Sequence, residues 1–191
     1  MWILGGNDDF YDCSEDKLHN DVWSSADGEE WRLEVENAEW SKRTYHQTVV
    51  FDDKIWLIGG GSYLGEDANG RSILGKLNDV WCSEDGVNWT EVTATAPFEP
   101  RFWFTMEVYR DRMWVLGGIS QEHKNIGDVW YSKDGSDWTE LRSQVTWSKR
   151  HELASWVFQD KLWVSAGASG DKHVLSNEVW SLHIPEAYLD A

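Results

Sequence analysis

Short hydrophobic runs alternate with polar turns along the whole chain, and the same order of runs returns every 49 to 58 residues. The clearest copy begins at Thr44–Phe51, which is rich in β-branched and aromatic residues and ends at an Asp-Asp turn. A short apolar run, Ile55–Ile58, follows and stops at three glycines. Two further runs, Asp79–Ser83 and Trp89–Val92, flank the turn Glu84-Asp85-Gly86. The pattern predicts four short antiparallel strands in each repeat.

Two landmarks fix the repeat boundaries. One is Trp-x-x-Gly-Gly, at Trp2, Trp56 and Trp114, with a degenerate copy at Trp163. The other is Asn-Asp-Val-Trp and its variants, at Asn20–Trp23, Asn78–Trp81, Gly127–Trp130 and Asn177–Trp180. Four-stranded units at this period predict an all-β propeller, or part of one, in a single domain, 1–191, with repeats at about 1–36, 37–93, 94–143 and 144–184.

The predicted propeller has four blades in this chain, of which the first and the last are incomplete. The first repeat begins at its second strand, and the last one ends after its third. The chain could be a complete ring, half of a two-chain ring or a piece of a longer protein. Because open sheet edges invite pairing with other chains, we expect the ring to close within one chain or by dimerisation.

The two landmarks together resemble the kelch repeat, in which a strand ending in a glycine pair precedes an aromatic strand and a further tryptophan. Gly5-Gly6, Gly59-Gly60 and Gly117-Gly118 match, and Ala166-Gly167 is the degenerate copy. The resemblance covers essentially the whole chain and implies a kelch-type β-propeller, similar to bacterial kelch-like proteins and to the central domain of galactose oxidase. It implies no single function, because that superfamily includes adaptors, sugar-processing proteins and a copper oxidase.

The hairpins Ser83–Trp89 and Ser132–Trp138 are similar to the Asp-box of sialidases, with one residue fewer between aspartate and glycine. We interpret them as structural hairpins in which the aspartate caps the turn and the tryptophan packs between blades.

Charge and hydropathy limit the partners of the chain. The 34 acidic and 17 basic residues give a net charge of −17, which disfavours nucleic acid and anionic membranes. The sequence contains no apolar run of membrane-spanning length and no signal peptide, so we expect a soluble protein.

Three aligned segments carry an arginine thirteen residues before a Trp-x-x-Gly landmark: Arg43, Arg101 and Arg150. Each lies at the entrance to an innermost strand, and these entrances surround the mouth of a propeller's central channel. The three guanidinium groups could converge there on a carboxylate or sulfate. Alternatively, they bond carbonyl groups and acids of their own blades. The kelch resemblance favours the ligand, since kelch adaptors of ubiquitin ligases hold acidic peptides with arginines near this position.

The residues that follow each arginine vary: Thr44-Tyr45-His46, Phe102-Trp103-Phe104 and His151-Glu152-Leu153. Aromatic groups beside cationic donors suit a sugar ring or a peptide side chain, although they could also plug the channel. The candidate ligand-binding residues are therefore Arg43, Arg101, Arg150, Tyr45, His46, Trp103, His151 and Glu152.

These observations favour a non-catalytic binding scaffold that recognises a protein segment, a carbohydrate or an acidic ligand at the channel mouth, and no catalytic residue is assigned. The alternative is a sugar-processing enzyme of the sialic-acid mutarotase kind that uses Arg43, Arg150, His151 and Glu152. A copper oxidase is not expected, because neither Cys13 nor Cys82 is in register with the histidines.

No cofactor and no metal site are expected from the sequence. The oxygen-rich segments Asn7–Asp9 and Glu66–Gly70 could hold Ca²⁺, but the EF-hand spacing is absent and such loops are more often simply solvated.

Overall fold

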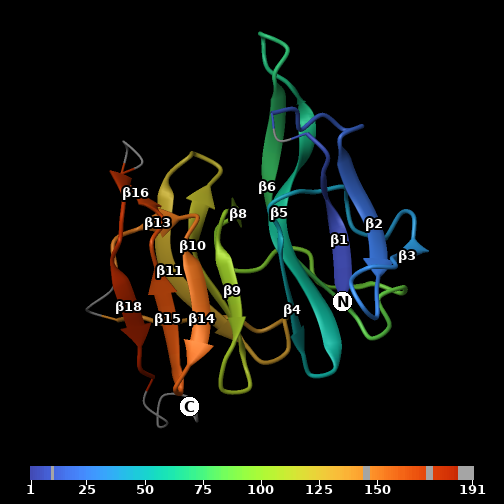
Figure 1. Cartoon of the computed structure of the whole chain (residues 1–191). Coiled ribbons are helices and arrows are strands. Elements are labelled where there is room, and N and C mark those ends of the chain that lie inside the picture. Colours follow the sequence, from blue (N-terminus) through green and yellow to red (C-terminus); the bar gives the residue numbers. More distant parts are fainter. Residues whose placement is uncertain (10, 144–146, 171–173, 185–191) are drawn as a thin grey trace. The chain divides into compact units, whose positions relative to one another are not determined.

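The computed structural model describes residues 1–9, 11–143, 147–170 and 174–184, which form 18 β-strands and no helix (Figure 1). The chain divides into two compact units, Met1–Phe102 (unit 1) and Trp103–Ala191 (unit 2). Among the described residues, no helix is long and apolar enough to cross a membrane. Of the predicted fourth repeat, residues 144–146 and 171–173 lie outside the described part.

Unit 1 contains two antiparallel sheets whose strands follow chain order. The first sheet consists of β1 (Trp2–Asn7), β2 (Leu18–Ser24) and β3 (Arg32–Val35). The second consists of β4 (Gln47–Phe51), β5 (Lys54–Glu66), β6 (Ser72–Ser83) and β7 (Thr90–Thr93), and β8 (Arg101–Phe102) follows it. Strands β5 and β6 continue past the ends of β4 and β7 as a long hairpin (Figure 1).

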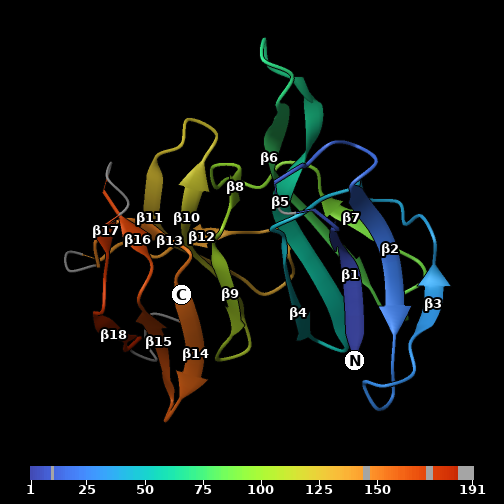
Figure 2. The same ribbon diagram turned by 45° about the horizontal axis from the view of Figure 1, so that its top comes forward.

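Unit 2 contains the equivalent sheets of the third and fourth repeats (Figure 2). The third repeat pairs β9 (Thr105–Val108), β10 (Met113–Ser120), β11 (Asn125–Ser132) and β12 (Thr139–Glu140) in that order. The fourth pairs β14 (Ala154–Phe158), β15 (Lys161–Ser165) and β18 (Val179–Leu182). A small sheet joins β13 (Arg150–His151), β16 (Ala168–Ser169) and β17 (Val174–Leu175).

The innermost hairpin has the same turn in three repeats. Both turn residues have positive φ at Asp52-Asp53, Arg110-Asp111 and Gln159-Asp160, which is the backbone of a two-residue type I′ turn. The indole of Trp114 closes its turn by donating a hydrogen bond to the Tyr109 carbonyl at 2.8 Å. The Trp-x-x-Gly tryptophans Trp56 and Trp163 make the same bond at 2.9 Å, so this landmark is a turn clamp.

The Asp-box-like hairpins are structural, as interpreted from the sequence. In one copy, Ser83 Oγ accepts a bond from the Gly86 amide at 2.8 Å, and Asp85 accepts from the amides of Val87 and Asn88. The Trp89 indole then bonds the Gly86 carbonyl at 3.2 Å. These backbone donors lower the pKa of Asp85 far below its usual range.

Each unit has its own hydrophobic core between two sheets. In unit 1, Leu4 and Val22 of the first sheet pack with Ile55 and Leu57 of the second, under Trp40 and Trp89. The two indoles meet edge to face, with ring centroids 6.0 Å apart. In unit 2, Trp114, Leu116 and Val129 pack against Leu162 and Val164. Burial of one apolar face of each sheet explains why single sheets need neighbours.

We expect Trp114→Ala to lower the free energy of unfolding by about 3–5 kcal/mol, because it removes a fully buried aromatic side chain. Trp163→Ala is the matched control, since Trp163 makes the same turn bond but is only partly buried. Its loss should be about 1–2 kcal/mol. Urea unfolding measures both, and equal losses would show that the turn bond, not burial, decides the stability.

Candidate functional site

Arg43 lies inside its repeat and not on a ligand-accessible surface. Only 1% of its side chain is exposed. Nη1 and Nη2 bind both oxygens of Asp79 at 2.8 and 2.7 Å, and Nη1 also donates to the Gly59 carbonyl at 3.0 Å. Nε and Nη2 bind the carbonyl and hydroxyl of Ser41 at 3.1 Å. All five N–H donors are therefore used within the protein.

Arg150 repeats this arrangement in unit 2. Its buried guanidinium donates to Glu178 Oε2 at 2.5 Å, to the Ala166 carbonyl at 2.8 Å, and to the hydroxyl of Ser148 at 2.8 Å. Arg101 is also buried, donates from Nε to the Glu99 carbonyl at 2.9 Å and lies over the Phe98 ring.

The expected role of the arginines as anion-binding groups therefore needs correction for Arg43 and Arg150. An anionic ligand would have to displace Asp79 or Glu178, which are the acids of the Asn-Asp-Val-Trp motif and its variant. Charge-assisted bonds of this geometry are the strong ones in proteins. We assign these two arginines a structural role.

The residue two positions after each arginine takes a left-handed backbone. The φ angles are 59° at Tyr45, 55° at Trp103 and 53° at Glu152. This conformation costs a residue other than glycine on the order of 1 kcal/mol or more, and such residues concentrate at functional sites. Their side chains are half-buried or exposed, whereas the residues just before them, Thr44 and His151 among them, are buried. The middle residue of each triplet is thus more exposed than the residue before it.

In unit 1, Tyr45 lies beside Phe102, with ring centroids 5.3 Å apart. The Lys76 ammonium lies 4.2 Å from the centroid of Phe102, and burial lowers the pKa of Lys76 to about 8. Lys76 therefore remains mostly protonated at pH 7, and its contact with the Phe102 ring favours the charged form.

His46 is a neutral core histidine. Its Nδ1 atom is buried and has no hydrogen-bond partner among the residues that the structure describes, and its ring centroid lies 6.2 Å from that of Trp40. Burial, helped by the nearby charge of Arg43, lowers the pKa of His46 to about 4. His46 therefore has the surroundings of a packing residue rather than of a ligand contact.

In unit 2, Trp103, His151 and Glu152 form a connected group. The Trp103 and His151 rings stack with centroids 5.3 Å apart and planes 23° apart. The Glu152 amide donates to the Trp103 carbonyl at 2.8 Å. His151 Nδ1 bonds the side-chain oxygen of Asn125 at 2.5 Å, which fixes the ring. The aromatic pair is thus held in place, and Glu152, the residue after His151, has an exposed side chain.

The structure adds a polar chain that the sequence reasoning missed. Ser155 Oγ donates to Glu107 at 2.6 Å and lies 2.5 Å from Thr105 Oγ1. These contacts join β14 to β9. In the sequence, Thr105 follows Trp103 by two residues and Ser155 follows Glu152 by three. One feature of the sequence indicates that Glu107 is unusual. In the aligned innermost strands, Glu107 stands where the other repeats have Val49 and Trp156, so a carboxylate interrupts an apolar position.

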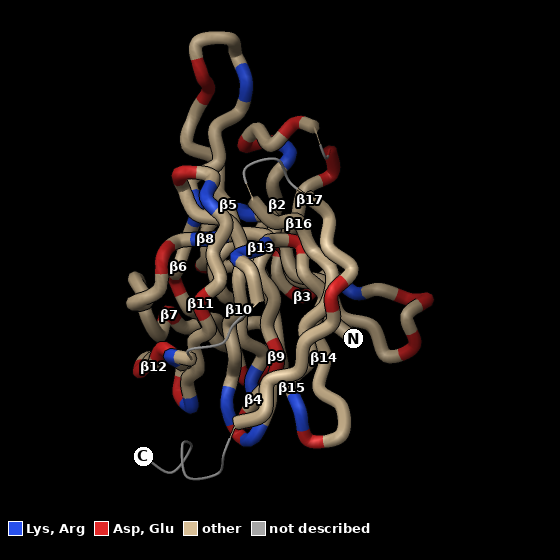
Figure 3. Tube along the Cα trace, turned by 90° about the vertical axis from the view of Figure 1, so that its left-hand side faces the viewer, with Lys and Arg blue, Asp and Glu red and all other residues tan. Residues whose placement is uncertain are grey.

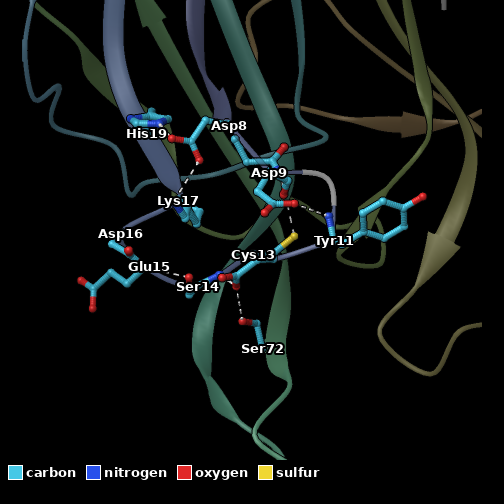
Figure 4. A network of polar contacts seen from close by, with 12 residues as sticks. Asp8, Asp9, Tyr11, Cys13, Ser14, Glu15, Asp16, Lys17, His19 and Ser72 are labelled. Carbon is cyan, nitrogen blue, oxygen red and sulfur yellow. Dashed lines mark hydrogen bonds and ion pairs between the residues drawn. The ribbon is translucent and has the colours of Figure 1, made fainter.

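The acidic loop that follows β1 is held by protein donors (Figure 4). Asp8 pairs with Lys17 and His19, Asp9 accepts from the Tyr11 amide, and Asp12 accepts from Ser72 at 3.2 Å. Acidic residues occur in the loops and turns of both units (Figure 3). Among the described residues, no group of three His, Cys, Asp or Glu side chains could hold a metal ion.

The antiparallel sheets and the comparison with solved structures define a β-propeller-like fold. The solved structure of YjhT matches with a TM-score of 0.66 at 13% identity, covering 89% of this chain and 56% of that one. At this identity, the likeness concerns the fold alone. In sequence, 77 residues, 40% of the chain, are 27% identical to the tag-53 protein of Caenorhabditis elegans, of which they cover 5%. No model of a known protein family matches the chain.

Asp79→Asn should lower the free energy of unfolding by about 3 kcal/mol, because it leaves the buried Arg43 guanidinium without its counter-charge. Glu178→Gln is the matched control, since the Glu178 side chain is 52% exposed against 12% for Asp79. Because solvent screens the exposed Glu178 carboxylate, Glu178→Gln should lower the free energy of unfolding by less than Asp79→Asn does. Urea denaturation compares the two, and a smaller loss for Asp79→Asn would contradict the structural role.

The pKa of His46 also predicts a pH dependence of stability. Between pH 6.5 and about 4, the unfolded chain binds a proton at this residue that the folded chain does not. The free energy of unfolding should therefore fall by up to about 3 kcal/mol over this window. Because many carboxylates titrate there too, the test compares the wild type with His46→Gln at pH 7, 5 and 4. Parallel stability curves would show that His46 is not responsible.

Proposed function

We propose that the protein is a kelch-like propeller of four blades in this chain and that it handles a carbohydrate at the Trp103, His151 and Glu152 group of unit 2. The observation that carries this proposal is the Trp103 and His151 stack, followed in the chain by an exposed Glu152 at a left-handed backbone position. Aromatic rings pack on the apolar face of a sugar, and a carboxylate accepts bonds from its hydroxyl groups.

The chemistry of this group suits sugar processing of the mutarotase kind. Opening and closing a sugar ring requires one group that gives a proton to the ring oxygen and one that takes a proton from the anomeric hydroxyl. Glu152 supplies an exposed carboxyl group and His151 a second proton carrier, and Glu107, bonded to Ser155, is a further carboxyl group on β9 of the same unit. The likeness to YjhT concerns the fold alone, so this function rests on the chemistry of these side chains.

A second candidate is a binding scaffold without catalysis, for a carbohydrate or a protein segment. It is supported by the arrangement of the variable residues, since Tyr45, Trp103 and Glu152 stand on a backbone that is otherwise the same in each repeat. Binding needs only such a set of presented side chains on a rigid scaffold.

The experiment measures binding and anomer exchange by NMR with two probes, free sialic acid and galactose. We expect the protein to bind at least one sugar and to accelerate its exchange between anomers. Trp103→Ala should weaken binding about tenfold, the scale of one aromatic contact. Glu152→Gln should reduce the exchange rate at least tenfold with a smaller effect on binding.

Trp156→Ala and Glu122→Gln are the matched controls in the same unit, and neither residue belongs to the proposed site. Binding that depends on Trp103 without any acceleration would establish the scaffold function and contradict catalysis. Absence of binding to both sugars, or equal effects of the control variants, would contradict the carbohydrate proposal.

A further inference from the structure

The sheet of the first repeat has one apolar face that nothing covers among the described residues. Ile3 occupies the position of Leu57, Val115 and Val164 in the other repeats. Those three residues are fully buried, whereas Ile3 is 48% exposed. In the sheet register, Ile3 lies beside Trp23, and Trp23 lies beside Leu33, which is also exposed. The three side chains therefore form one row, with Ile3 and Leu33 exposed and Trp23 half-buried, which we call the leading face.

The leading face includes a hollow of about 330 Å³ that Trp23 and Leu33 line together with Asp21 and Lys42. The equivalent of Trp23 in the second repeat is Trp81, which packs against the core of unit 1. In the core of unit 1, the leading face of the second repeat is covered by the first repeat. Leu4 and Val22 of the preceding repeat pack with Leu57 and Trp81, and Trp40 of the same repeat joins them.

The sheet of the fourth repeat exposes the opposite face. Val179 occupies the position of Val22, Val80 and Val129, which are at most 3% exposed, yet Val179 is 59% exposed. We call this the trailing face. Trp156 and Trp163 lie on it as register partners with parallel rings, 6.2 Å between centroids. Ser165 stands where the other repeats have Leu4, Ile58 and Leu116, so this face is less apolar at one position.

The two faces are complementary in kind, because leading and trailing faces of successive repeats bury each other within unit 1 and within unit 2. Contiguous exposed apolar side chains mark association sites. We propose that the trailing face of one copy of the chain docks on the leading face of a second copy. The trailing face of the second copy docks in the same way on the leading face of the first. Such a head-to-tail contact made twice closes a ring and leaves neither face exposed.

The test uses analytical ultracentrifugation of the whole chain between about 1 and 100 µM. We expect a dimer for the wild type. Ile3→Asp on the leading face and Val179→Asp on the trailing face should each give monomers, because each variant damages both contacts of the ring. Mixed in equal amounts, the two variants should form a heterodimer, because the intact trailing face of the Ile3→Asp variant can dock on the intact leading face of the Val179→Asp variant. The dissociation constant of this heterodimer should be at least tenfold higher than that of the wild-type dimer.

Val50→Asp is the matched control for Val179→Asp, since Val50 is an exposed strand valine on neither face. It should leave the dimer unchanged. Circular dichroism of each variant checks the fold, and both substituted positions are exposed in the single chain. A monomeric wild type at 100 µM would overturn the proposal. So would a dimer that survives either single variant, because that would indicate like-with-like docking. The outcome is independent of sugar binding.

Discussion

The buried arginine at the entrance to an innermost strand is the interaction on which the rest of the structure depends. The backbone of Arg43 belongs to the edge of the first sheet, where it accepts a bond from Gly6 and donates one to His19. Its side chain belongs to the second sheet, where it binds Gly59 and Asp79. One residue therefore ties two repeats together. Because a buried guanidinium must have every donor satisfied, it also fixes the glycine bulge and the acid of the Asn-Asp-Val-Trp motif.

This constraint separates the constant part of the repeat from the variable part. The residue after Arg43 or Arg150 is buried, and the residue after that one has a left-handed backbone conformation. Tyr45, Trp103 and Glu152 share that backbone and differ in chemistry. Specificity can then change at these positions without disturbing the cores, as is usual for residues presented by a rigid scaffold. The strain at each position is offset by the bonds of the neighbouring arginine.

Much of the fold could be predicted from the sequence, because its signals are local. Trp56, the Asp52-Asp53 turn and the Gly59-Gly60 pair each act within one hairpin, and the structure gives each the geometry its residue types favour. The site could be predicted only in part. The sequence placed Arg43 correctly at a strand entrance, but it could not show that the guanidinium turns inward to Asp79, a partner 36 residues away. Glu107 was missed for a similar reason, since its partner Ser155 lies in another repeat.

A double-mutant cycle between Arg43→Met and Asp79→Asn tests the central role of the arginine most directly. The free energy of unfolding is measured for the wild type, both single variants and the double variant. We expect each single change to destabilise strongly and the double change to cost at least about 2 kcal/mol less than the sum, because it removes the unpaired buried group. Additive effects within about 0.5 kcal/mol would show that the two side chains act independently, and would contradict the account.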